Sequence, residues 1–438
     1  MKIQMLAGAA MAALIGIAVP VSAASPSYPS NAKSVAPSAD RAVAAFYASR
    51  NNAPLWLSGA NLEAANQFVA ALERAPLDGL ANGPDLAARA RMLIARGQAG
   101  DAGAKAEAER LLSSAWVNYA TALRSPMAGM SYADNWVKPR SLTAGQILAS
   151  AAAAHSLSRH VAEVSAVNPV YSALRDAAWS AAQANGGALD PRVITSLDRA
   201  RVSPFQNRYI MGDAASARLF MIEDGRIADV MKVIVGKPGQ ETQTPMVAST
   251  IYYATLNPYW HVTDGLVREL IAPNVMKQGA KYLSERGYQL FDRYGDDAQQ
   301  IDPASVDWPA VAAGRQNIEV RQLPGPANSM GQMKFGFANP YDIYLHDTPR
   351  KELFSQADRD LSHGCIRLED APRLARWLVG RDPSGSSEAP EQHVALRSPV
   401  PIYVTYLTAH AEHGGLAFAD DIYGRDASAA SMQVASLR

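Results

Sequence analysis

Residues 362–367 read Ser-His-Gly-Cys-Ile-Arg, and the local fold and the chemistry of the chain are both centred on this run. Cys365 is the single cysteine of the 438-residue chain, so an internal disulfide is excluded. Three interpretations remain: a buried inert thiol, an intermolecular disulfide or a reactive nucleophile. Gly364 favours the third. A glycine before the thiol permits a tight turn that points backbone N–H groups at one spot, as an oxyanion hole requires.

A candidate base precedes the thiol by nineteen residues, in the run Ile-Tyr-Leu-His-Asp at 343–347. An imidazole beside a cysteine makes the reactive thiolate accessible near neutral pH. Because side chains alternate along a strand, Tyr344 and His346 are expected to share one face, whereas Ile343 and Leu345 turn to the core. The histidine and the thiol can then meet across neighbouring strands.

His363 is an alternative base. It lies two residues before Cys365, and residues two apart on an extended strand point the same way. It can equally serve as a structural hydrogen-bonding residue or as part of the oxyanion environment. We take His346 as the base and keep His363 among the catalytic candidates.

The surrounding sequence predicts a mostly β domain over residues 207–426. Asp224-Gly225 separates two β-branched runs and is a strong hairpin signal. Asp370 is placed to cap a helix. The segment 262–316 interrupts the strands with Gly, Asp, Pro and a helical pattern, and is interpreted as an inserted lid. The runs expected to form strands are 217–222, 227–235, 251–256, 318–323, 343–346 and 400–407, and those expected to form helices are 265–286 and 371–379.

The N-terminal half is expected to be helical and to carry an export signal. Residues 1–23 combine a positively charged start, an apolar run and a small-x-small cleavage pattern, which is typical of a cleaved signal peptide; an uncleaved anchor is the alternative. Residues 24–37 form a flexible Ser/Pro/Ala-rich lead-in, and 38–206 an Ala-rich helical scaffold domain with a helix within 101–123. Residues 427–438 are assigned as a C-terminal tail. The predicted fold class is therefore α+β.

The composition argues against several classes of partner. Lys and Arg together number 41, as do Asp and Glu, so the formal net charge is zero and nucleic acid is not expected as a partner. No stretch after the signal reaches the ~20 apolar residues of a membrane span, so no stable membrane insertion is expected. The other histidines show no metal-ligand spacing, and we expect neither a metal nor a cofactor. The acidic residues of 420–426 are interpreted as a solvated loop rather than a calcium site.

The His346–Cys365 spacing and the Ser-His-Gly-Cys motif resemble the signature of YkuD-type L,D-transpeptidases. Residues 46–56 resemble the scaffold domain of the large Gram-negative branch typified by YcbB. This resemblance implies a mostly β YkuD catalytic domain with an inserted lid, plus an N-terminal all-helical scaffold domain. Further runs that resemble the same branch are 235–238, 243–245, 257–260, 321–326, 334–337 and 344–349.

The resemblance also implies a reaction. Cys365 attacks the carbonyl between the third residue of a peptidoglycan stem tetrapeptide and its terminal D-Ala. D-Ala leaves, and the third-residue amine of a second stem resolves the thioester to give a 3→3 cross-link. His346 takes the thiol proton and later serves the acceptor amine, while the backbone carbonyl of Asp347 orients its ring. The N–H groups of Gly364 and Cys365 form the oxyanion hole.

Four further residues are assigned to substrate binding: Tyr344, Trp260, Arg367 and Ser362. Tyr344 and Trp260 are expected to shape the cleft, with core packing as the alternative for both. Arg367 stands where many family members have Asn, and it either binds a substrate carboxylate or forms a structural ion pair. The resemblance further implies acylation of Cys365 by carbapenems. A periplasmic location is expected, with cell-wall synthesis proteins as further candidate partners.

Other functions remain open. The same acyl-enzyme can be resolved by water, as in an L,D-carboxypeptidase, or by a protein lysine, as in an anchoring transpeptidase. A non-catalytic wall-binding module with an idle cysteine is a third option. The small peptidoglycan-binding domain usual in this branch is not found, because too little chain lies between 166 and 207. Wall targeting is therefore expected to rest on the lid, the scaffold or a partner.

Overall fold

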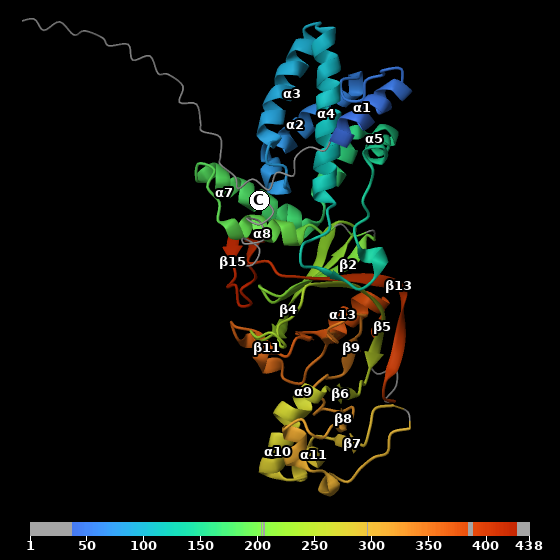
Figure 1. The fold of residues 1–438 in the computed structure, drawn as a ribbon, viewed down its shortest axis with the longest axis vertical. Coiled ribbons are helices and arrows are strands. Elements are labelled where there is room, and N and C mark those ends of the chain that lie inside the picture. Colours follow the sequence, from blue (N-terminus) through green and yellow to red (C-terminus); the bar gives the residue numbers. More distant parts are fainter. Residues whose placement is uncertain (1–36, 203, 205, 296, 384–388, 427–438) are drawn as a thin grey trace, which may run out of the picture.

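The computed structural model describes residues 37–202, 204, 206–295, 297–383 and 389–426. Three parts follow one another along the long axis of the molecule: N-terminal helices at one end, a large sheet in the middle and the predicted insertion at the other end (Figure 1). The predicted signal peptide, residues 24–36 of the lead-in and the C-terminal tail lie outside the described residues. Within the described ranges, no helix has both the length and the apolar character that crossing a membrane requires.

The N-terminal half is helical, as the sequence predicts. Asp101 caps its longest helix by accepting a hydrogen bond from Ala104 N at 2.9 Å. Phe68 packs 5.4 Å from the ring of Trp56 and 5.1 Å from that of Trp116, which gives this part an aromatic core. Its helices are α1 (Pro37–Ser49), α2 (Leu62–Arg74), α3 (Gly83–Gln98), α4 (Ala102–Leu123), α5 (Ala144–Ala153), α6 (Leu157–Ala166), α7 (Pro169–Ala184) and α8 (Pro191–Ala200).

One segment corrects the prediction of an all-helical domain. Strand β1 (Ser131–Tyr132) pairs in parallel with β5 (Val247–Leu256) and so joins the edge of the large sheet. The carbonyl of Met246 accepts the Ser131 N–H at 3.1 Å, which satisfies a backbone group that would otherwise be exposed beside the sheet. The linker between α4 and α5 therefore fastens the helical part to the β domain.

The large sheet closes on itself. Strand β9 pairs with both β10 and β5, so the order β5-β13-β2-β3-β4-β12-β10-β9 returns to its start. Closure removes the exposed edges that an open sheet presents, while β11 pairs with β4 outside this ring. The strands are β2 (Arg208–Asp213), β3 (Arg218–Glu223), β4 (Arg226–Gly236), β9 (Met333–Phe335), β10 (Leu345–His346), β11 (Asp360–Ser362), β12 (Ile366–Leu368) and β13 (Gln392–Thr405).

Two local predictions are confirmed. Asp224 and Gly225 have φ values of 50° and 74°, the left-handed pair that joins β3 to β4 in a tight hairpin. Helix α13 (Ala371–Val379) begins where the sequence places it, because Asp370 Oδ1 accepts the Arg373 N–H at 2.9 Å. Its buried residues include Leu374 and Leu378, which pack into the main core.

The insertion is a small body with a core of its own. Strands β6 (Trp260–Val262) and β7 (Tyr288–Phe291) both pair with β8 (Glu319–Gln322), so the insertion begins and ends on strands that flank the predicted range. The helix predicted over 265–286 is broken by a π-helical turn and by Gly279, whose φ is 76°. Its helical elements are α9 (Asp264–Leu266), η4 (Val267–Ile271), α10 (Ala272–Gln278), α11 (Lys281–Glu285) and α12 (Trp308–Ala312).

The C-terminal acidic residues connect the two halves of the chain, which corrects the prediction of a solvated loop. Asp426 forms an ion pair with Arg199 of α8 at 2.6 Å and accepts the Thr408 hydroxyl at 2.6 Å. Asp421 accepts the Tyr406 hydroxyl at 2.8 Å. The small hairpin of β14 (Ala409–Glu412) and β15 (Gly415–Phe418) lies beside α7 in the same region (Figure 1).

Candidate active site

The thiol and the imidazole are carried by neighbouring strands. Cys365 immediately precedes β12, which runs parallel to β10, and the register places His346 opposite Arg367. The Ile366 N–H donates to Tyr344 O at 3.1 Å, so Cys365 lies beside Tyr344. Because side chains alternate along each strand, Tyr344 and His346 of one strand share a face of the sheet with Cys365 and Arg367 of the other. The strand pairing places the histidine and the thiol on one face of neighbouring strands, as expected, while direct contact between the two groups stays a prediction; the thiol lies 3.9 Å from Asp342 O.

The predicted alternation along β10 is confirmed as well. Ile343 and Leu345 are buried in the main core, at 4% and 0% exposure. Tyr344 and His346 lie on the other face with their ring centroids 5.9 Å apart. Tyr344 also packs against the core of the insertion, so the insertion borders the site.

His346 is held as a neutral base. Its Nδ1 lies 2.5 Å from the backbone oxygen of Asp347. This carbonyl can only accept, so Nδ1 carries the proton and Nε2 keeps its lone pair. Burial, reinforced by the positive charge of Arg367, lowers the pKa of His346 to about 3. The imidazole is therefore uncharged at neutral pH, and the carbonyl of Asp347 orients it as the resemblance implies.

Asp347 is itself fixed by several contacts. Its Oδ1 lies 2.6 Å from Lys351 Nζ, and its Oδ2 accepts the Gln332 N–H at 2.9 Å. Lys351 also donates to the carbonyls of Leu368 and Glu369, which ties this region to the end of β12. Lys351 and Gln332 were not among the predicted site residues, because their contacts with Asp347 depend on how the loops fold.

The surroundings of Cys365 favour the thiol over the thiolate. The side chain is partly exposed, yet packing around the sulfur raises the pKa of Cys365. Hydrogen bonds from the backbone and hydroxyl of Tyr344, together with the charges of Lys334 and Arg367, oppose this rise. The pKa directions of both groups favour their neutral forms, a thiol and an imidazole. Activation of the thiol by the imidazole stays a prediction.

The turn before the thiol is locked by two hydroxyl groups. Gly364 has a φ of +107°, which favours glycine, and its carbonyl accepts the Thr244 hydroxyl at 2.8 Å. The Ser362 hydroxyl donates to Cys365 O at 2.6 Å and accepts the Gly364 N–H at 3.2 Å. Ser362 is 1% exposed, so it shapes the turn, which corrects its assignment to substrate binding. The oxyanion role of the Gly364 N–H stays a prediction, because Ser362 engages that group here.

His363 points to the surface rather than into a hydrogen-bond network. It is exposed, and no other described residue forms a hydrogen bond with its ring. Partial burial and the charge of Lys237 lower the pKa of His363, while Glu269 of the insertion opposes the shift. Its alternative role as base stays a prediction, and its proximity to Glu269 again places the insertion beside the site.

Two cations lie on the catalytic face. Within the described part of the chain, no carboxylate lies within ion-pair distance of Arg367; burial and the nearby Arg350 lower its pKa. Lys334, which pairs with His346 in the register of β9 and β10, holds its Nζ 4.2 Å from the centre of the Tyr344 ring. The structural ion pair considered for Arg367 is therefore not formed. Lys334 was missed as a site residue, since only the strand register reveals its position.

Trp260 is a packing residue. It is 7% exposed within the core of the insertion, with its ring 6.3 Å from that of Tyr288. This burial corrects its assignment to the substrate cleft and supports the alternative of core packing. In the described ranges, no three His, Cys, Asp or Glu side chains gather as a metal site requires.

Comparison with known proteins identifies two segments of the chain. The model of the L,D-transpeptidase catalytic domain, YkuD, matches residues 207–402, and that of the Scaffold domain matches 41–177. A Haemophilus influenzae protein named "Putative L,D-transpeptidase" is 31% identical over 242 residues, which cover 54% of this chain and 48% of that protein. The chain thus spans about half the length of this curated relative.

Two solved structures are similar over part of the chain. The carbamoyl enzyme that Ldtfm forms with avibactam is 13% identical with a TM-score of 0.23, covering 47% of this chain and 51% of that one. An L,D-transpeptidase from Mycobacterium smegmatis is 16% identical with a TM-score of 0.23, covering 45% of this chain and 58% of that one. Overlaps at this level describe a partial likeness only.

Proposed function

Because this chain belongs to the YkuD family of L,D-transpeptidases and also carries a Scaffold domain, we propose that it is a peptidoglycan L,D-transpeptidase. The proposed reaction forms 3→3 cross-links through a thioester on Cys365. One observation carries the proposal. His346, oriented by the Asp347 carbonyl, lies on the strand beside the one that starts directly after Cys365.

The neutral pair of thiol and imidazole sets the order of proton transfers. Nε2 of His346 removes the thiol proton as the sulfur of Cys365 attacks the carbonyl carbon before the terminal D-Ala. The imidazolium then gives this proton to the departing amine, so D-Ala leaves and a thioester remains. In the second half, His346 takes a proton from the acceptor amine as its nitrogen attacks the thioester. The C–S bond breaks, and the departing thiolate takes the proton back from the imidazolium, which restores the starting state.

The charges of the catalytic face support an anionic substrate. Arg367 has no ion pair within the described residues, and Lys334 contacts the Tyr344 ring. A stem peptide brings carboxylates, and a guanidinium binds a carboxylate with two parallel hydrogen bonds. Arg367 is thus proposed to bind a substrate carboxylate, and Tyr344 to line the cleft beside the thiol.

The cellular setting is part of the same proposal. Cross-linking peptidoglycan requires export, which the predicted signal peptide supplies, and the periplasm as the place of action. Carbapenems, which mimic an acyl donor, are proposed to acylate Cys365. Cell-wall synthesis proteins are proposed as further partners.

The test is incubation of the purified mature protein with disaccharide-tetrapeptides, followed by mass spectrometry of the products. A dimer that has lost one D-Ala is expected, and Cys365→Ala should yield none. A tripeptide monomer alone would indicate the carboxypeptidase, and transfer to a lysine-containing acceptor protein the anchoring enzyme. If Cys365→Ala gave the same products as the wild type, thioester catalysis would be wrong.

A further inference from the structure

A pocket separate from the Cys365 site lies in the helical part, between α2, α6 and α7. Its volume is about 470 Å³, within the ~300–1,000 Å³ range of small-molecule sites. The hollow has a simple cause in the sequence, because alanines occupy facing positions of the helices and cannot fill the space between them. These alanines are Ala70, Ala71, Ala162 and Ala166.

Two arginines reach this hollow with unused donors. Arg175, 3% exposed, donates from Nη1 to Ser165 O at 2.6 Å and to Asp78 Oδ1 at 3.3 Å. Arg74 donates from Nη1 to Asp176 Oδ1 at 3.1 Å. The Nε atoms of both arginines are buried without a hydrogen-bond partner, although Asp176 Oδ1 lies 3.7 Å from that of Arg175. Five other arginine Nε atoms in the described residues are buried without a hydrogen-bond partner away from this pocket, so it is the two neighbouring guanidinium groups at one cavity, rather than their Nε atoms, that indicate a ligand.

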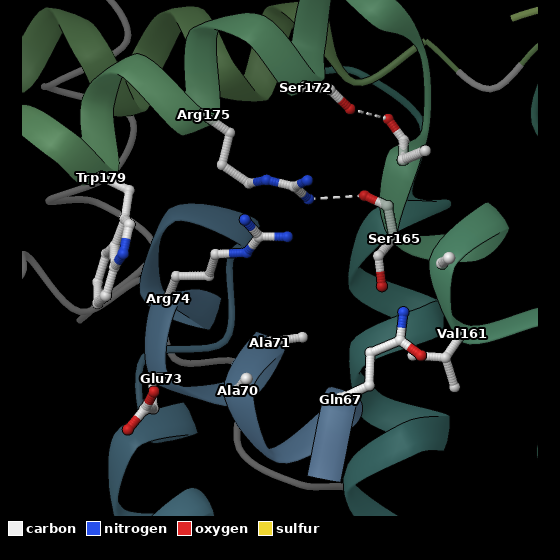
Figure 2. Close-up of a pocket in the computed structure, with 12 residues that line it drawn as sticks. Gln67, Ala70, Ala71, Glu73, Arg74, Val161, Ser165, Ser172, Arg175 and Trp179 are labelled. Carbon is white, nitrogen blue, oxygen red and sulfur yellow. Dashed lines mark hydrogen bonds between the residues drawn. The ribbon is translucent and has the colours of Figure 1, made fainter. Parts of the chain in front are cut away.

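The arrangement of polar groups in the pocket indicates which chemical group of a ligand would accept hydrogen bonds from the two arginines. Figure 2 shows the guanidinium groups of Arg74 and Arg175 next to one another, with the Gln67 amide facing them across the hollow. Planar guanidinium groups match the two oxygens of a carboxylate. Each guanidinium group already has one carboxylate partner, Asp78 for Arg175 and the exposed Asp176 for Arg74, so an incoming anion has to compete with Asp176.

The charge balance favours a single negative charge. Asp78 is the buried counter-charge of Arg175, and Asp176 partly neutralises Arg74. Glu73, at the rim of the pocket, pairs with Arg91. A phosphate dianion would meet these carboxylates at close range, whereas a single carboxylate can take the place of the exposed Asp176 side chain beside Arg74.

We propose that this pocket binds the carboxylate end of a short peptide with small side chains. The alanine floor accepts methyl-sized groups, the two guanidinium groups hold the carboxylate, and Gln67 is positioned to bond the peptide amide. Wall peptides and protein C-termini both offer this chemistry. The proposal concerns a site separate from Cys365 and does not depend on the catalytic reaction.

Isothermal titration calorimetry of the mature Cys365→Ala chain tests the proposal without interference from thiol chemistry. The probes are N-acetyl-D-Ala-D-Ala, N-acetyl-L-Ala-L-Ala, their C-terminal amides and inorganic phosphate. At least one dipeptide acid is expected to bind with 1:1 stoichiometry. Its amide, like phosphate, should bind at least about tenfold more weakly. Preference for the D-form would assign the site to wall peptides, and preference for the L-form to protein termini.

Four variants locate the binding. Arg74→Gln removes a donor, and Ala162→Leu narrows the pocket without changing charge; each should weaken binding about tenfold or more. Asp176→Asn should strengthen it, because the competing carboxylate is lost, and a purely structural role would not produce this gain. Arg89→Gln, an exposed arginine paired with Glu107 outside the pocket, is the matched control and should bind as the parent does.

Some outcomes would overturn the proposal. These are the absence of saturable binding, equal binding of acid and amide, and phosphate binding as tight as that of the acid. Unchanged affinity in both Arg74→Gln and Ala162→Leu would place the ligand elsewhere. Arg175 is left intact, since its buried pairing with Asp78 makes loss of folding the expected result of substitution.

Discussion

Glu109 in the helical part and Arg367 in the catalytic domain are both charged side chains withdrawn from water, yet their surroundings are opposite. Glu109, 5% exposed, accepts the Tyr47 hydroxyl at 2.6 Å and the N–H groups of Leu55 and Leu57 at 2.8 and 2.6 Å. Within the described residues, the Arg367 guanidinium forms neither a hydrogen bond nor an ion pair. A buried charge whose hydrogen bonds are satisfied stabilises a fold, whereas one without partners is available to a ligand.

The titrating groups of the site follow the same division. Glu109 is held in place by hydrogen bonds from the backbone N–H groups of residues 55–57. The pKa of His346 is lowered and that of Cys365 raised, so burial favours the neutral form of each. Shifts in opposite directions within one contact cluster are typical of catalytic pairs. In the helical part, the buried carboxylate is therefore compensated by hydrogen bonds, whereas in the active site desolvation shifts the pKa values of the reacting groups.

The largest expected effect is that of His346→Ala, because the site loses its base. The rate of D-Ala release should fall by roughly 10²–10⁴-fold, the contribution of general acid–base catalysis. His363→Ala is the matched control and should retain most activity, since its ring points to the surface. A larger loss in the His363 variant would reverse the assignment of the base.

Glu109→Gln tests the other side of the comparison. The variant keeps the shape but turns an acceptor of several buried N–H groups into a group with one acceptor oxygen. The free energy of unfolding should fall by about 3 kcal/mol, measured by urea denaturation. Activity per folded molecule should be unchanged. Glu107→Gln, an exposed neighbour, should lose at most about 0.5 kcal/mol, and an equal loss in both variants would contradict the argument.

Arg367→Gln should impair activity but not stability, the reverse of what is expected for Glu109→Gln. Stability is expected to hold or rise, because an unpaired cation leaves a partly buried site. KM for the tetrapeptide should increase by about 10–100-fold through loss of a charge-assisted contact, with kcat less affected. Steady-state kinetics and denaturation of the same preparation measure both. A variant that unfolds readily but binds substrate normally would show that Arg367 is structural.

The smallest effect is expected in the pH dependence of the rate at which a carbapenem acylates Cys365, measured by mass spectrometry. An ordinary histidine, with a pKa near ~6.5, would lose about 30-fold of its basic form by pH 5. Because the pKa of His346 is lowered to about 3, its basic form persists and the rate should change about twofold at most between pH 8 and 5. The raised pKa of Cys365 keeps the thiol protonated over this window. A fall in the acylation rate as the pH drops through 6.5 would contradict a neutral His346 beside a neutral Cys365.

Much of the site was predictable because it depends on local patterns. The alternation around His346, the glycine before the thiol and the Asp-Gly hairpin each follow from a few consecutive residues. The cap of α13 by Asp370 is local in the same sense. The sequence also indicated the helical scaffold, since helix periodicity needs only one turn or two to be recognised.

The errors came from contacts between distant positions. Trp260 is as compatible with a cleft as with a core until β7 and β8 pack around it. Ser362 is an exception, because its bonds with Gly364 and Cys365 are local and depend on the conformation of the turn. The acidic tail appeared solvated because its partner, Arg199, lies more than two hundred residues earlier in the chain.

The sequence by itself determined the glycine turn before Cys365 and the strand face that carries the candidate base, because strand alternation and glycine conformation act over a few residues. Only the tertiary structure decided that β9 closes the sheet against β5 and that Lys334 and Arg367 border the thiol. It also decided how packing shifts the pKa values of His346 and Cys365, each toward the neutral form. Strand register and desolvation are sums over the whole fold, and no short run of residues contains them.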